Sequence, residues 1–125
     1  MREVKFQAWD KWEKEMLPVA GINFTNEFMW INELIDDETS ANTRYLDEVV
    51  LRQYTGVNDV KNREIFEGDI GWVDYHDCHG LVKNIKGKLV YEWGNSIDDF
   101  FKMFEHVEVI GNIYENPELL ESENE

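Results

Sequence analysis

Apolar and polar residues alternate with a period of two over much of the chain, a pattern typical of β-strands that bury one face. Residues 4–9 alternate in this way, and after a charged connection the apolar run 16–22 can form a returning strand. Pro18 lies in that run and has no N–H to donate, so the returning strand belongs at a sheet edge or a bulge. The pattern therefore predicts an N-terminal β-hairpin layer or small subdomain.

The stretch 24–31 fits two periods. Its apolar residues fall at helical spacing, but they also alternate as a strand, with Phe28 and Trp30 on one face and Met29 on the other. We favour the strand, because large aromatic residues are common in strands. The polar, acidic stretch 32–44 that follows predicts a loop.

Strand patterns resume in the second half of the chain. We expect strands over 45–54 and 69–75, separated by a loop at 55–62, and a last strand over 106–114. A turn at 76–80 leads to two further short strands. Their residues, 81–85 and 89–93, are joined through Lys86-Gly87, a sequence that favours a tight hairpin.

Two short helices are predicted near the C-terminus. Ser96 is a candidate N-cap, and the four apolar residues after it recur at helical spacing, so a helix is expected over 96–104. These residues are Ile97, Phe100, Phe101 and Phe104. Pro117 suits the first helical position of a single turn at 117–120, and 121–125 form a frayed tail.

The step Glu67-Gly68-Asp69 precedes the strand at 69–75 and predicts a sharp corner. Gly68 can adopt a positive φ, and the Asp69 side chain can bond the amides that follow it. Short strands joined by tight turns, with one helix before the last strand, favour a mainly β protein with an SH3-like barrel. We expect the barrel-like unit over 45–120 and the N-terminal subdomain over 1–44.

Composition changes this picture mainly through charge. The chain has 125 residues, which suits one domain with a small subdomain, and a net charge of −15. Residues 19–50 contain seven acidic residues and one basic residue, and residues 95–125 contain nine and one. Such a field repels nucleic acids and anionic membranes, so neither is expected as a direct partner. One cysteine and no apparent secretory signal favour the cytoplasm.

Two groups of residues could carry chemistry. Glu64, Glu67 and Asp69 could act in acid–base catalysis or metal binding, but carboxylates this close are common in an acidic chain. In the turn at 76–80, His76, Cys78 and His79 are candidate zinc ligands, although a structural zinc site normally has four ligands at recognisable spacing. We therefore predict no enzyme and no cofactor, and regard both groups as parts of loops.

The tryptophans and the acidic segments indicate contact surfaces. We expect Trp12, in a charged turn, to be exposed and available to a partner. We expect the other four tryptophans to serve the core; they are Trp9, Trp30, Trp72 and Trp93. Short strands with open edges favour a homo-oligomer. The candidate interaction surface comprises Trp12, Asp36, Asp37, Glu38, Asp98 and Asp99.

Three blocks in order along the chain resemble a known family. They are Lys5-Phe6-Gln7-Ala8-Trp9-Asp10-Lys11, the segment from Gln53 to Ile70, and Val109 to Leu120 with its Ile-Gly-Asn-Ile-Tyr-Glu-Asn-Pro core. This combination resembles the YopX-type proteins of phages and prophages of Gram-positive bacteria. The resemblance implies a phage origin and a β-rich fold but brings no reaction. This chain departs from the family at Lys61-Asn62-Arg63, where an Asn-Gly pair is usual.

Three functions remain open from the sequence. The first is a non-catalytic accessory protein that assembles with itself and binds a host or phage protein. The second is an acidic mimic of DNA that inhibits a host DNA-handling protein, with carboxylates in place of phosphates. The third is a small metal-dependent hydrolase that uses Glu64, Glu67, Asp69 and the loop at 76–79.

Overall fold

A computed structural model of the chain describes residues 4–31, 42–74 and 77–121. The chain divides into two compact units at Gln53/Tyr54. We call Val4–Gln53 the N-terminal unit and the described residues from Tyr54 onward the C-terminal unit. The predicted loop residues 32–41 and the frayed tail 122–125 lie outside the described residues.

The N-terminal unit is built from strands β1 (Phe6–Asp10), β2 (Glu15–Pro18), β3 (Gly21–Asn23), β4 (Phe28–Trp30) and β5 (Thr43–Tyr45). The short helix η2 (Leu46–Glu48) leads into β6 (Val49–Asn58). β1 lies between β2 and β6, with Ala8 opposite both Leu17 and Leu51. The predicted hairpin is thus confirmed, but its returning strand is shorter than the predicted 16–22. β2 ends at Pro18 on a sheet edge, and Gly21–Asn23 form β3 in another sheet.

A second, three-stranded antiparallel sheet completes this unit, in the order β3-β4-β5. Met29, in the middle of β4, is fully buried and joins Ala8 and Val49 in the core. The strand favoured for 24–31 is confirmed for Phe28–Trp30, whereas 24–27 form the turn from β3 to β4. The first residues of the predicted acidic loop lie outside the description, and its last two begin β5.

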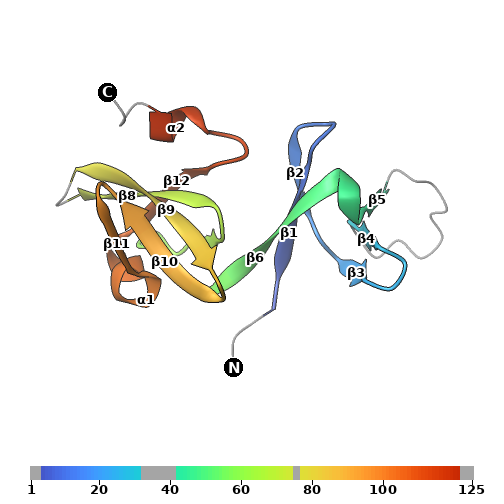
Figure 1. Cartoon of the computed structure of the whole chain (residues 1–125), viewed down its shortest axis with the longest axis horizontal. Helices are drawn as coiled ribbons and strands as arrows, with labels where there is room; N and C mark the ends of the chain where they lie inside the picture. The colour runs from blue at the N-terminus through green and yellow to red at the C-terminus, as the bar shows by residue number, and fades with distance from the viewer. Residues whose placement is uncertain (1–3, 32–41, 75–76, 122–125) are drawn as a thin grey trace. The chain divides into compact units, whose positions relative to one another are not determined.

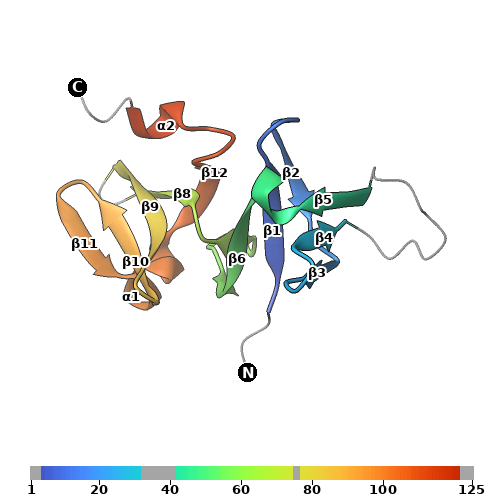
Figure 2. The same cartoon turned by 45° about the vertical axis from the view of Figure 1, so that its right-hand side comes forward.

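The C-terminal unit contains a five-stranded antiparallel sheet in the order β11-β10-β9-β8-β12 (Figure 1). Its strands are β8 (Asp69–Val73), β9 (Cys78–Ile85), β10 (Lys88–Trp93), β11 (Ser96–Asp99) and β12 (Glu108–Asn112). The sheet curls, as Figure 2 shows from a second angle, and the residues it buries form one core. These are Ile65, Val73, Val82, Leu89, Tyr91, Phe100, Met103 and Val107. The prediction of a mainly β protein is confirmed.

β6 crosses the boundary between the units. Its residues up to Gln53 pair with β1, whereas Tyr54 and Asn58 pair with β7 (Glu64–Phe66). The boundary therefore falls later than the predicted 44/45, because β5 and the first half of β6 pair within the N-terminal unit. The predicted loop at 55–62 is correspondingly shorter, since β6 extends to Asn58.

The helix predicted over 96–104 is wrong in its first half. Ser96–Asp99 form β11, which pairs with Val90–Trp93 of β10. Helix α1 spans Phe100–Met103, followed by η4 (Phe104–His106), and Asp99 rather than Ser96 caps it by accepting from the Phe101 N–H at 3.0 Å. Backbone pairing with β10 satisfies the amides that a longer helix would have used.

Two turns agree with the sequence prediction. Lys86 and Gly87 both have positive φ, 53° and 88°, as the tight hairpin between β9 and β10 requires. Near the C-terminus, the predicted helical turn is present as α2 (Glu118–Glu121), which begins one residue later than the predicted 117–120. None of the helices in the described ranges has the length and apolar character needed to cross a membrane.

Candidate functional site

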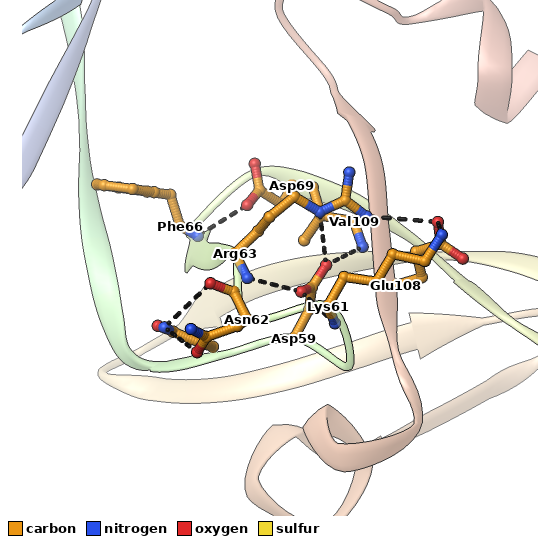
Figure 3. A network of polar contacts seen from close by, with 9 residues as sticks. Asp59, Lys61, Asn62, Arg63, Phe66, Asp69, Glu108 and Val109 are labelled. Carbon is orange, nitrogen blue, oxygen red and sulfur yellow. Dashed lines mark hydrogen bonds and ion pairs between the residues drawn. The ribbon is translucent and has the colours of Figure 1, made fainter.

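The loop between β6 and β7 is organised by the carboxylate of Asp59, whose side chain is 0% exposed (Figure 3). Oδ1 accepts the backbone N–H groups of Lys61 at 2.9 Å and Arg63 at 2.8 Å. Oδ2 accepts from the N–H of Val109 at 2.8 Å and from Nε of Arg63 at 3.2 Å. One side chain therefore joins its own loop to strand β12.

These contacts decide the protonation of Asp59. Burial acts to raise the pKa of this carboxyl, but the N–H groups of Val109, Arg63 and Lys61 and the Arg63 charge together hold the pKa below the ordinary 3.8. Glu108 adds ion pairs to Lys61 at 3.0 Å and to Arg63 at 3.4 Å. Both oxygens of Asp59 are engaged in holding the backbone, which suits a structural carboxylate rather than a general base.

Gly68 and Asp69 form the corner that the sequence predicted. Gly68 has φ of 88°, its N–H donates to the Val82 carbonyl, and its carbonyl accepts from Ile113. The Asp69 side chain was expected to bond the amides after it. Its Oδ2 accepts from the N–H of Phe66, three residues earlier, at 2.8 Å (Figure 3). Phe66 is the last residue of β7 and Asp69 is the first residue of β8, so this hydrogen bond joins the two strands across the corner.

The three carboxylates proposed for acid–base or metal chemistry have separate surroundings. Asp69 is buried and bonds Phe66, Glu67 accepts from the Asn84 amide at 3.0 Å, and Glu64 lies on β7 opposite Asn58. Within the described ranges, no group of three or more His, Cys, Asp or Glu side chains is arranged to hold a metal ion.

The histidine and cysteine candidates lie largely on a strand rather than in a turn. β9 begins at Cys78, which pairs with Val73, and His79 pairs with Trp72. The rings of Trp72 and His79 meet edge to face at 4.9 Å between centroids. His76 lies outside the described residues. The strand begins earlier than predicted because β8 supplies backbone partners as far as Val73.

The acidic residues named as an interaction surface are only partly described. Asp98 accepts from Nε1 of Trp93 at 2.6 Å, and Asp99 caps α1; both are half-buried. Each carboxylate thus has a role inside the C-terminal unit. Asp36, Asp37 and Glu38 lie outside the described residues.

The prediction that four tryptophans serve the core is confirmed for Trp93 alone among the four. None of the four is buried, and each is partly exposed; they are Trp9, Trp30, Trp72 and Trp93. Trp93 packs against the core of the C-terminal unit, whereas Trp72 lies on the outer side with His79. Trp12 is 77% exposed, as predicted.

A group of partly exposed aromatic rings in the N-terminal unit lies on one side of the sheet β3-β4-β5. Directly paired strand residues share a face, so Phe28 and Tyr45 lie together, and Trp30 lies on the same side two residues beyond Phe28. We call Phe28, Trp30 and Tyr45 the aromatic face. Tyr45 is 64% exposed, and the rings of Phe28 and Trp30 are 5.9 Å apart.

Gly21 allows this arrangement. It pairs directly with Trp30, and a Cβ built on Gly21 would lie 2.1 Å from Cζ2 of the indole. The indole therefore covers the glycine backbone of the neighbouring strand and is held there by contact rather than extended into solvent. Phe24, in the turn that joins β3 to β4, adds a further ring that is 68% exposed.

The opposite side of the same sheet is fixed to the core. Met29 packs there, and Arg44, opposite Met29, donates from Nε to Oδ2 of Asp10 at 2.7 Å. Asp10 also accepts the N–H groups of Trp12 and Glu13, both at 2.9 Å. Burial acts to raise the pKa of Asp10, but these hydrogen bonds and the Arg44 charge hold the pKa below its ordinary value.

Sequence reasoning missed the aromatic face. The alternation over 24–31 separates Phe28 and Trp30 from Met29, but the larger rings suggested the buried side. The pairing of Tyr45 with Phe28 across the long connection 32–41 leaves no local signal. Residue size predicted the wrong side, because the core of this unit is formed by Ala8, Met29 and Val49 on the side of the sheet that carries Met29.

The geometry defines a mainly β protein of two units, with a curled five-stranded sheet in one and an exposed aromatic face in the other. This chain belongs to the YopX protein family, whose pattern matches residues 5–121. The resemblance seen in the sequence blocks is thereby confirmed. Among solved structures, protein EF1440 from Enterococcus faecalis is similar at 27% identity, with a TM-score of 0.73 over 96% of this chain and 99% of that one. A comparison with curated proteins gives no match.

Proposed function

We propose that this chain is a non-catalytic accessory protein of a phage or prophage, which acts by binding another protein and by assembling with itself. The observation that carries the proposal is the aromatic face, a set of rings on the outer side of a sheet whose inner side is bound to the core. Aromatic residues are over-represented among the residues that dominate binding energy at protein interfaces. A rigid sheet presents them at little cost in conformational entropy.

A non-catalytic role is supported by the surroundings of the polar residues. The carboxylates of Asp59, Asp69 and Asp99 each accept backbone N–H groups and so hold loops, corners and caps in place. Carboxylates used in this way are occupied in holding the backbone of the fold. This distribution favours binding over the hydrolase alternative.

Self-assembly is assigned to the C-terminal unit. β11 is an outer strand of the five-stranded sheet, and Ile97 in its middle is 59% exposed. Phe101, which follows in α1, is 48% exposed. An outer strand that carries exposed apolar side chains can pair with the same strand of a second copy. Asp98 and Asp99 accept hydrogen bonds within the unit, so both carboxylates are already held by groups of their own chain.

Two measurements test the proposal. Light scattering after size exclusion, at rising protein concentrations, should give a mass above that of one chain, and Ile97→Lys should lower it while Ile85→Lys should not. A tagged pull-down from host lysate should repeatedly recover one host protein with the wild-type chain. The Tyr45→Ala variant should no longer recover that protein. The proposal would be wrong if light scattering gave the mass of one chain at every concentration and the pull-down retained no protein specifically. Loss of the bound protein only at high salt, with no effect of Tyr45→Ala, would favour the acidic DNA mimic instead.

A further inference from the structure

The sequence that carries the aromatic face is acidic. From Gly21 to Glu48 the sequence has seven acidic residues and a single basic one, Arg44. Arg44 lies on the opposite side of the sheet, where its Nε donates to Asp10 at 2.7 Å. Its Nη1 donates to the Thr43 carbonyl at 3.0 Å. Strands β3, β4 and β5 therefore place no cationic side chain on the side that carries the rings.

Described acidic residues are linked to the ring residues along the chain and through backbone hydrogen bonds. Glu27 is exposed and precedes Phe28, and its carbonyl accepts from the N–H of Leu46 at 2.9 Å. Glu48 accepts from the N–H of Tyr45 at 2.8 Å through Oε1. Asp47, which lies between Tyr45 and Glu48 in the sequence, is exposed. The Glu48 carboxylate thus contacts the backbone of Tyr45, and the exposed acidic residues Glu27 and Asp47 lie within two residues of Phe28 and Tyr45 along the chain.

This combination favours one kind of ligand. An arginine guanidinium stacks on aromatic rings, is less strongly hydrated than an ammonium, and forms two parallel hydrogen bonds to a carboxylate. Rings beside carboxylates satisfy both preferences at once. Bases of single-stranded nucleic acid also stack on aromatic rings, but their phosphates would meet an acidic surface and be repelled.

We propose that the aromatic face binds arginine side chains of a basic segment of another protein. The guanidinium groups stack on Trp30 and Tyr45, and the carboxylates of Glu27 and Asp47 neutralise their charge. This inference rests on the proposed protein-binding function and names the chemistry of the partner. It also accounts for Gly21, because any side chain at that position would displace the indole.

A defined peptide tests the proposal without knowledge of the natural partner. The probe is a fluorescein-labelled peptide with arginines spaced by glycine and serine, and its control carries citrulline, which is neutral and nearly the same shape, at each arginine. Fluorescence anisotropy with the full chain should give binding of the arginine peptide at least about tenfold tighter than the citrulline peptide. Trp30→Ala and Tyr45→Ala should each weaken it roughly two- to fivefold, the range expected for one cation–π contact.

Matched variants separate the role of the rings from general effects. Tyr45→Phe keeps the ring and should bind like wild type, as should Trp12→Ala, which removes an exposed tryptophan from the β1–β2 turn. Glu27→Gln with Asp47→Asn should weaken binding and reduce its dependence on salt. In case a variant folds poorly, titration of the wild-type protein by NMR provides an independent measurement. The indole N–H of Trp30 should shift on addition of the arginine peptide, while that of Trp12 should not.

Equal binding of the arginine and citrulline peptides, or shifts centred on Trp12, would overturn the inference. Tighter binding of an oligothymidine strand at Trp30 than of the arginine peptide would also overturn it. These outcomes are distinct from failure of the proposed function. If the wild type and Tyr45→Ala capture a host protein equally well, the chain binds proteins through another surface. If the wild type captures no host protein, the proposed protein-binding function is itself wrong.

Discussion

The carboxylate of Asp59 accepts a hydrogen bond from the backbone N–H of Val109, fifty residues further along the chain, at 2.8 Å. The same side chain holds the N–H groups of Lys61 and Arg63 in its own loop. Three backbone donors therefore depend on one buried carboxylate. Asn62, in the middle of the loop, has φ of 62° and allows the turn that brings these donors together.

Asp59→Asn should destabilise the C-terminal unit markedly. The amide has a similar shape but presents an N–H₂ group toward N–H donors, so at least one buried donor loses its partner. We expect the free energy of unfolding to fall by roughly 2–3 kcal/mol, the cost of an unsatisfied buried group bonded to a charge. Urea unfolding followed by circular dichroism measures it. Asp47→Asn, at an exposed site, is the control, and equal effects of the two substitutions would contradict the role given to Asp59.

Acid should weaken the protein through the same group. Because the pKa of Asp59 is lowered below 3.8 in the folded state, the unfolded chain binds the proton more readily. The contribution of Asp59 is therefore complete above the ordinary aspartate pKa and is lost as the pH falls through the folded pKa. Unfolding free energies measured from neutral pH downward should fall less steeply for Asp59→Asn. Parallel curves would show that other groups cause the acid loss, with Asp10 the first to test because its pKa is lowered too.

Removal of Arg44 should cost less than removal of Asp10, although the two form a partly buried ion pair at 2.7 Å. After Arg44→Met, Asp10 retains the N–H groups of Trp12 and Glu13, so its charge stays partly compensated. Asp10→Ala leaves the Arg44 charge and both amides without that partner, and we expect a loss of about 3 kcal/mol or more. Thermal unfolding of both variants, with Lys11→Met as an exposed control, compares them. The reverse order would mean that the amides contribute little.

Gly68→Ala should destabilise the protein more than Gly87→Ala. Both glycines have φ of 88°, so both substitutions pay the same backbone strain, about 1–2 kcal/mol. A Cβ at Gly87 meets nothing within 4 Å, whereas one at Gly68 lies 3.1 Å from the Tyr114 ring. The difference between the two unfolding free energies therefore measures packing at the corner. A Tyr114→Leu background should reduce that difference, and its persistence there would assign the extra cost to something other than the ring.

The local sequence determined those parts of the fold that depend on neighbouring residues. Alternation marked the strand at β8, and Lys86-Gly87 marked the hairpin between β9 and β10, because a two-residue turn with positive φ has few solutions. Gly68 marked the corner for the same reason. Three ordered blocks were enough to indicate the YopX family, which the match over residues 5–121 confirms.

Tertiary structure decided the features in which two local patterns competed or distant residues met. Ile97 and Phe100 fit a helix by spacing, yet β10 offered backbone partners and Ser96–Asp99 became a strand. Trp30 is large and apolar, yet the core of its unit lies on the side of the sheet that carries Met29, so the indole lies over Gly21 on the outer side. Periodicity tells which residues share a face, but only the packed structure determines which face is buried, because burial depends on the volume that other segments have already filled.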